Sequence, residues 1–199
     1  MAGYSAAHDL AGLASMAADF DAFVKSDVVF WQLTDDGPLL NRYPKLTVAG
    51  LLFCMRKLQM LPNLLAPAQH AECAAQISAV QAQISNWRAN IERKAAREFA
   101  GRLRSWSWFV DEAGLEQKAA VRHYAQEAYG RTYLQLLLEL LQNQSTHAAL
   151  AAQVAARDAQ LRSVWEPARF VWDAQLQPAF PADVYWYLYG VPDADARKL

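Results

Sequence analysis

The fold of this chain is decided by residues 67–112, which read PAQHAECAAQISAVQAQISNWRANIERKAAREFAGRLRSWSWFVDE. Within this stretch, large apolar side chains recur at steps of three and four residues, at Ile77, Val80, Ile84, Trp87 and Ile91. This spacing places them on one face of an α-helix. Because polar side chains fill the other faces, the stretch is predicted to be an amphipathic helix that buries one side. Pro67 suits the first turn of that helix.

The length of this helix constrains its shape. An unbroken helix over these residues would span about 69 Å at about 1.5 Å per residue, whereas a compact chain of this size is roughly 40 Å across. The helix is therefore expected to bend unless the protein is elongated. Gly101 is the expected place for the bend, because glycine is unfavourable in a helix interior. Gly114 is expected to end the helix as a left-handed cap.

Further helices are predicted on both sides of this stretch. Their approximate ranges are 5–25, 45–60, 116–142 and 145–165. Ser5 is the expected N-cap of the first of them. Residues 27–33, DVVFWQL, fit either a short strand or a buried turn of helix. Helix or irregular structure is favoured, because no partner strand is evident elsewhere in the sequence.

Two surface ion pairs are predicted on the C-terminal helices. Glu127 and Arg131 are four residues apart, which is the favourable spacing for a pair along a helix. Asp158 and Arg162 have the same spacing. Both pairs are expected to lie on solvated helix faces.

The C-terminal part of the chain combines many aromatic rings with prolines. The rings between residues 165 and 191 are Trp165, Phe170, Trp172, Phe180, Tyr185, Trp186, Tyr187 and Tyr189. The prolines, Pro167, Pro178 and Pro181, prevent a continuous helix, while so many rings favour burial. An extended strap laid across the helices is therefore predicted, with a short helical turn at 183–189.

Together these patterns predict an all-α fold, a helical bundle of five or six helices with an extended aromatic C-terminal strap. A single domain over 1–199 is expected. It comprises N-terminal helices in 1–62, long antiparallel helices in 67–165 and the aromatic strap in 166–199. The composition, 54% hydrophobic and 20% charged, is typical of a folded globular protein.

Charge and hydropathy limit the partners and the cellular location that can be expected for the protein. The net charge of −1 gives no general attraction to nucleic acid or to anionic lipid. The N-terminus does not resemble a secretory signal, and the most apolar runs, 46–54 and 133–141, are shorter than the about 20 residues of a membrane-spanning helix. A cytoplasmic protein without membrane association is expected. Cys54 and Cys73 are expected to be buried, reduced thiols.

The sequence offers little catalytic chemistry. The four histidines, His8, His70, His123 and His147, stand near the starts of different predicted helices and lack the paired spacing of ligands in helical metal sites. Neither a nucleophile elbow nor a phosphate-binding loop occurs. Asp111, Glu112 and Glu116 are expected to be solvated at helix ends. No catalytic residue, metal or cofactor is therefore predicted, and a non-enzymatic role is favoured over an enzyme.

The leading hypothesis is a protein-interaction module that binds a second copy of itself. It rests on the leucine-rich part of the helix at 116–142, which has more large apolar side chains than one helix face can hide. The predicted interface residues are Leu134, Leu137, Leu138 and Leu141. A homodimer is the expected assembly.

Two alternatives remain open. One is a small-ligand or cofactor-binding bundle, which could be an enzyme, with a site between the strap and the long helix. The residues proposed for that site are Arg88, His123, Tyr124 and Trp172. The other alternative is a nucleic-acid-associated protein that uses the basic segment Arg88–Arg104, flanked by Trp87, Trp106 and Trp108. For that segment, a solvated helix face with packed tryptophans is the favoured interpretation.

Overall fold

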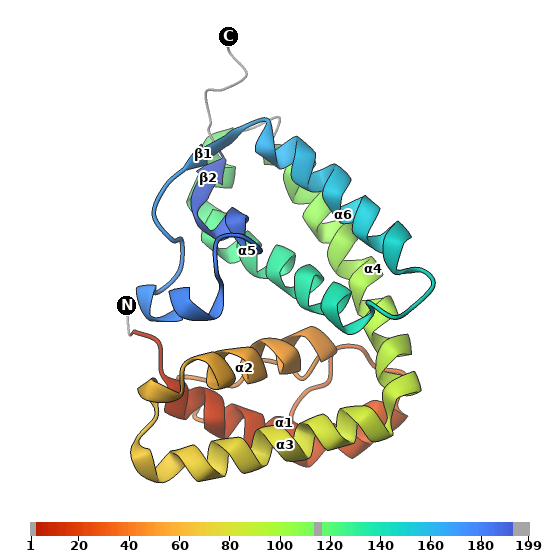
Figure 1. The fold of residues 1–199 in the computed structure, drawn as a ribbon, viewed down its shortest axis with the longest axis vertical. Coiled ribbons are helices and arrows are strands. Elements are labelled where there is room, and N and C mark those ends of the chain that lie inside the picture. Colours follow the sequence, from red (N-terminus) through yellow and green to blue (C-terminus); the bar gives the residue numbers. More distant parts are fainter. Residues whose placement is uncertain (1–2, 114–116, 193–199) are drawn as a thin grey trace. The chain divides into compact units, whose positions relative to one another are not determined.

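The structure, a computed structural model, describes residues 3–113 and 117–192, and the side chains within these ranges except those of 112–122. The described residues form six α-helices and one short pair of strands (Figure 1). The helices are α1 (Ala6–Lys25), α2 (Val48–Met60), α3 (His70–Asn86), α4 (Arg88–Ala113), α5 (Gln117–Leu140) and α6 (His147–Arg162). The predicted all-α fold with an aromatic C-terminal segment is confirmed.

The chain divides into two compact units within α4. We call Met1–Glu98 the N-terminal unit and Phe99–Leu199 the C-terminal unit. α4 therefore contributes residues to both. The expectation of one domain over 1–199 stays a prediction.

The long helix predicted over 67–112 is two helices. α3 ends and α4 begins on either side of Trp87, whose backbone leaves the helical region at φ −106° and ψ 25°. α4 continues through Gly101 without a break, and the predicted bend at this residue stays a prediction. Both helices contact α1, and α4 does so through Asn90 and Lys94. We attribute the change of direction between α3 and α4 to this packing.

The start of α3 also differs from the prediction. Pro67 lies in a separate 3-10 turn, Pro67–Gln69, which follows another such turn, Pro62–Leu64. Gly114, the predicted cap, lies outside the described residues.

The N-terminal unit has a core between α1, α2 and α3. Fully buried side chains from these helices and from the loop before α2 include Leu13, Phe20, Leu46, Ala49 and Val80. Hydroxyl caps fix the starts of both leading helices. Ser5 Oγ accepts a hydrogen bond from the His8 amide at 3.2 Å, which confirms the predicted cap, and Thr47 Oγ1 accepts one from the Gly50 amide at 2.9 Å.

The connection between α1 and α2 is irregular. Trp31 and Leu46 exchange two backbone hydrogen bonds of 2.9 Å in an isolated bridge, so residues 27–33 are neither a helix nor a regular strand. Asp19 on α1 accepts hydrogen bonds from the Trp31 ring at 3.2 Å and from the Thr34 amide at 2.7 Å. These contacts hold the connection against α1.

In the C-terminal unit, α5 and α6 are antiparallel neighbours, as predicted (Figure 1). The chain then forms strand β1 (Trp165–Pro167), which pairs with β2 (Gly190–Pro192) in antiparallel register. Two 3-10 turns, η3 (Ala174–Ala179) and η4 (Trp186–Leu188), lie between the strands. The aromatic segment is thus closed at its ends by a strand pair that the sequence did not predict.

Rings from this segment form much of the C-terminal core. Phe180, Tyr185 and Tyr187 are fully buried. Tyr124 on α5 donates a hydrogen bond of 2.5 Å to the carbonyl of Tyr187, and the Trp172 ring donates one of 2.7 Å to the carbonyl of Ala125. These bonds fasten the segment to α5.

Candidate functional site

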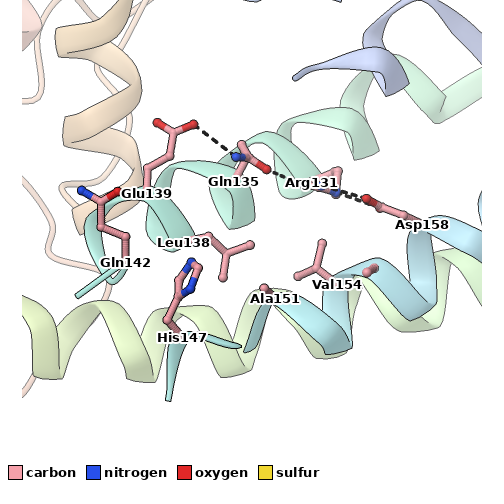
Figure 2. A pocket seen from close by; sticks show the side chains of 10 residues that line it. Arg131, Gln135, Leu138, Glu139, Gln142, His147, Ala151, Val154 and Asp158 are labelled. Carbon is pink, nitrogen blue, oxygen red and sulfur yellow. Dashed lines mark hydrogen bonds and ion pairs between the residues drawn. The ribbon is translucent and has the colours of Figure 1, made fainter. Parts of the chain in front are cut away.

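A pocket of about 370 Å³ lies between α5 and α6 (Figure 2). Each helix contributes side chains that recur every three or four residues, so one face of each helix lines the pocket. The lining residues are Arg131, Gln135, Leu138 and Glu139 from α5, Gln142 from the turn that follows it, and His147, Ala151, Val154, Ala155 and Asp158 from α6. Ala151 and Ala155 are one turn apart, and their small side chains leave room between the helices. The result is a hollow with an apolar base and polar ends.

An ion pair closes one end of this pocket. Arg131 binds Asp158 through two parallel hydrogen bonds, Nε to Oδ1 at 2.9 Å and Nη2 to Oδ2 at 2.8 Å. The two side chains are only 5% and 14% exposed, and the guanidinium also lies 4.6 Å from the centre of the Tyr187 ring. Burial alone would lower the pKa of Arg131, but the hydrogen bonds and charge of Asp158 raise it above its ordinary value. Arg131 therefore stays charged in this buried position.

This ion pair replaces both of the surface pairs predicted for these helices. Arg131 is buried and binds Asp158 rather than Glu127. The guanidinium of Arg162 lies 3.7 Å from the centre of the Trp186 ring. The predictions were wrong because a pair within one helix is worth only about 0.3–0.5 kcal/mol, which a bidentate contact between helices exceeds.

The residues predicted to bind a ligand do not form one cluster in either unit. Arg88 is in the N-terminal unit and pairs with Glu92 at 2.6 Å. His123 is exposed. Tyr124 is buried, which raises the pKa of its hydroxyl, and Trp172 stacks on Tyr129 at 4.3 Å between ring centres. In the structure, Tyr124 and Trp172 hold the aromatic segment to α5, and ligand binding by these four residues stays a prediction.

The leucines predicted to form an interface, Leu134, Leu137, Leu138 and Leu141, are all buried in the structure. They therefore present no exposed leucine patch. Self-association through them would require these side chains to leave their present packing, and it stays a prediction.

His70 and both cysteines contact other groups of the N-terminal unit. His70 contacts the carbonyl of Leu65 at 3.3 Å, and with Cys73 it lines a second pocket, of about 300 Å³, between α2 and α3. The Cys54 thiol donates to the carbonyl of Asp9 at 3.3 Å. Burial raises the pKa of both thiols, which makes them poor nucleophiles. Among the side chains that the structure describes, those of 3–111 and 123–192, no group of three or more His, Cys, Asp or Glu could hold a metal ion.

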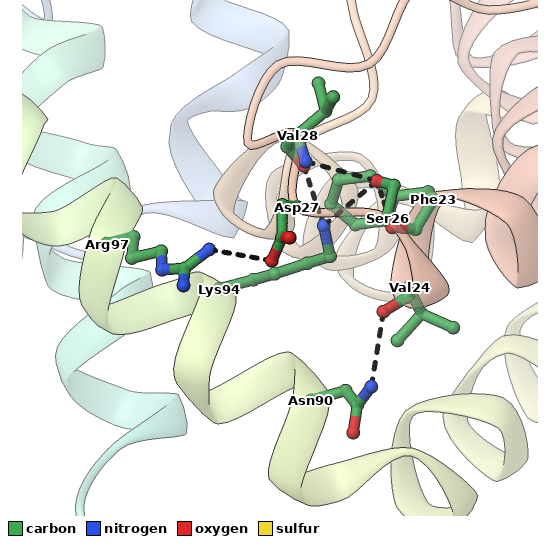
Figure 3. A network of polar contacts seen from close by, with 8 residues as sticks. All are labelled: Phe23, Val24, Ser26, Asp27, Val28, Asn90, Lys94 and Arg97. Carbon is green, nitrogen blue, oxygen red and sulfur yellow. Dashed lines mark hydrogen bonds and ion pairs between the residues drawn. The ribbon is translucent and has the colours of Figure 1, made fainter.

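Most of the basic segment Arg88–Arg104 is engaged within the chain. Lys94 is buried at the C-terminal end of α1, where its ammonium donates to the carbonyl of Val28 at 2.7 Å and lies 4.3 Å from the Phe23 ring centre (Figure 3). Arg97 pairs with Asp27 at 3.2 Å, as the same view shows. In the C-terminal unit, Arg102 stacks on the Tyr133 ring at 4.1 Å.

The two tryptophans at the end of this segment do not share a face. Trp106 is buried, whereas Trp108 is 63% exposed, so the prediction that both are packed is wrong for Trp108. The helical rotation of about 100° per residue separates side chains two residues apart by about 200°. The two-residue spacing of Trp106 and Trp108 in the sequence could therefore have predicted that the two rings lie on different faces of the helix.

Trp108 is the centre of an exposed face of α4. We call this set the Trp108 face, and it consists of Gly101, Arg104, Ser105, Trp108 and Asp111. Asp111 binds Arg157 of α6 at 3.0 Å, yet its side chain is still 54% exposed. Of the other carboxylates predicted near this helix end, the Glu112 side chain and Glu116 lie outside the described residues.

No helix in the described part of the chain combines the length and hydropathy needed to cross a membrane. Comparison of the chain with protein-family models, with curated proteins and with solved structures found no match.

Proposed function

We propose that this chain is a non-enzymatic protein-interaction module whose contact surface is the Trp108 face. The observation that supports this proposal is the 63% exposure of Trp108 on a regular helix. Leaving a large ring in water forfeits the roughly 25 cal/mol per Å² that burial of apolar area provides. Tryptophan is also enriched among the few residues that supply most of the energy of protein interfaces.

The surroundings of Trp108 suit an interface. Arg104, Ser105 and Asp111 give it a polar rim, as in protein interfaces with an apolar centre. Apart from the residues next to Gly101 and the adjoining backbone of α4, no described atom lies within 4 Å of the position that a Cβ of Gly101 would occupy. Packing inside the chain therefore does not require glycine there, whereas close approach of a partner would benefit from it.

The Trp108 face is a better interface than the leucines of α5. Leu134 and Leu137 are fully buried already, so a partner could gain no apolar area from them. Trp108 can lose most of its exposed area on binding without any rearrangement of the chain.

Photocrosslinking tests this proposal. A photoreactive residue, p-benzoylphenylalanine, is placed at position 105, beside Trp108, and in a control protein at position 82, which is exposed on α3. Irradiation of cells that produce each protein should yield a defined protein adduct from position 105 and none from position 82. Trp108→Ala should remove the adduct.

A matched substitution controls for the general effect of losing an exposed apolar side chain. Leu40 is 99% exposed in the N-terminal unit, and Leu40→Ala should leave the adduct intact. Absence of an adduct from position 105, or equal labelling from both positions, would contradict the proposal.

The pocket between α5 and α6 favours a second candidate function, the binding of a small molecule. Its volume lies within the range of ligand sites, and its apolar base and polar ends resemble their usual chemistry. This candidate predicts that some small polar metabolite raises the Tm of the protein in a thermal-shift screen. Ala151→Leu, which fills the hollow, should abolish that increase, and a screen without any stabilising compound would count against this function.

A further inference from the structure

We infer that the partner of the Trp108 face is a second copy of this chain, bound antiparallel about a two-fold axis at Trp108. This inference rests on the proposed function and names its partner. The argument starts from the two charges of the face. Arg104 is four residues before Trp108, and Asp111 is three residues after it.

Helix geometry places these charges on the same side of Trp108. With about 100° of rotation per residue, Arg104 lies about 40° and Asp111 about 60° from Trp108 in the same direction around the axis. Along the axis, Arg104 lies about 6 Å before Trp108 and Asp111 about 4.5 Å after it. The face therefore carries a positive charge and a negative charge at nearly equal distances from its centre.

A two-fold axis that passes between the two Trp108 rings, perpendicular to α4 and parallel to its exposed face, reverses the direction along the helix and keeps the charged side. It sets Arg104 of each copy opposite Asp111 of the other, with the two Trp108 rings in contact at the centre. Such an interface uses the same patch on both copies, as in most homodimers. Parallel pairing would instead place the charged sides of the two copies on opposite sides of the Trp108 rings, so neither Arg104 nor Asp111 would meet its opposite charge.

The charges also favour a second copy over an unrelated partner of one charge sign. A uniformly acidic or basic surface would meet one like charge on this face, either Asp111 or Arg104. The ion pair of Asp111 with Arg157 at 3.0 Å leaves its carboxylate half exposed, so it can accept a further hydrogen bond across the interface.

Charge reversal tests this arrangement on the full chain. Arg104→Glu and Asp111→Arg should each weaken self-association at least tenfold in analytical ultracentrifugation, because each places like charges opposite one another twice. An equimolar mixture of the two variants should restore a 1:1 heterodimer, since every contact in the mixed pair joins opposite charges. Trp108→Ala, with Arg104 and Asp111 left unchanged, should also weaken the homodimer.

Controls separate this test from folding and from the proposed function. Arg169→Glu makes the same change of net charge at an exposed position outside the face and should leave association unchanged, and circular dichroism should show the same helicity for all variants. A wild-type chain that stays monomeric at millimolar concentration, or a mixture that fails to form the heterodimer, would overturn the inference. An adduct from position 105 with a different protein would overturn it while leaving the interaction function in place, whereas no adduct at all would remove both.

Discussion

Lys94 and Glu98 are four residues apart on α4, and each stabilises the end of a different helix. Lys94 is at the C-terminal end of α1, where it donates to the carbonyl of Val28. Glu98 accepts a hydrogen bond of 3.1 Å from the Ala49 amide at the N-terminal end of α2. Each charge is opposite in sign to the partial charge of the helix end that it meets. One turn of α4 thus stabilises two other helices.

The burial of Lys94 predicts a pH dependence of stability. Burial lowers the pKa of Lys94 below its ordinary value of 10.5. Between these two pKa values the unfolded chain binds more protons than the folded chain, so the contribution of Lys94 to stability increases as the pH rises through this window. Urea unfolding of wild type and Lys94→Met between pH 7 and 10.5 should therefore show the wild-type advantage growing with pH.

The same variants give a prediction at pH 7. Lys94→Met loses a hydrogen bond from a charged group and should be less stable by about 1.5–3 kcal/mol. Lys25→Met is the control, because Lys25 is exposed and its pair with Asp21 should contribute less than about 1 kcal/mol. Parallel curves for wild type and Lys94→Met across this pH range would contradict the assigned burial of the ammonium group.

The buried pair of Arg131 and Asp158 should behave as a unit. Arg131→Met leaves a largely buried carboxylate without its cation and is expected to destabilise the protein by about 3–5 kcal/mol. Arg131→Met combined with Asp158→Leu should recover most of this loss, since two apolar side chains can replace a buried ion pair. Equilibrium unfolding of the three proteins measures the coupling, and additive losses would show that the two residues act independently.

At the scale of elements, α4 shows what the sequence predicts well and what it does not. Apolar periodicity predicted the helical character of 67–112, and hydroxyl residues predicted the N-cap at Ser5. The interruption at Trp87 was missed because nothing in the local sequence breaks a helix there. It arises from packing of α3 and α4 on α1. Gly101, which local propensity marks as weak, stays helical because a single unfavourable residue costs only about 1 kcal/mol.

Two glycines should respond to the same substitution in opposite ways. Gly101→Ala should stabilise the monomer by up to about 1 kcal/mol, because alanine favours the helix and the Cβ has open space. Gly190→Ala should destabilise it, since the added Cβ would lie only 2.4 Å from the carbonyl oxygen of Glu166 on β1. Thermal unfolding at low concentration, where monomers dominate, compares the two variants. Equal effects in both would contradict the different packing of the two positions.

At the scale of the whole molecule, the sequence predicted the class of fold but little of the candidate sites. An amphipathic pattern involves residues close together in the sequence, so the helices could be predicted from the sequence alone. The pair of Arg131 with Asp158 joins two helices, and its formation depends on their relative rotation, which no local spacing encodes. Helical rotation alone could have predicted that Trp108 and Trp106 lie on different faces of α4. This spacing is the sequence feature that pointed to the exposed face.

The position of α4 predicts how the chain unfolds. Because one continuous helix belongs to both compact units, unfolding of either unit leaves the half of α4 in the other unit with a frayed end. We therefore expect a single cooperative transition, with far-UV circular dichroism and tryptophan fluorescence changing together. Separate transitions for the two probes would contradict the prediction of one domain.

The strand pair of β1 and β2 gives the aromatic segment the connectivity of a closed ring. Backbone hydrogen bonds join its two ends, and further rings anchor it to α5 along its course. If a protease cut the peptide between η3 and η4, each half would still be held, one by β1 and the other by β2. The nicked polypeptide would then migrate as two pieces under denaturing electrophoresis while eluting as one intact particle from a native column.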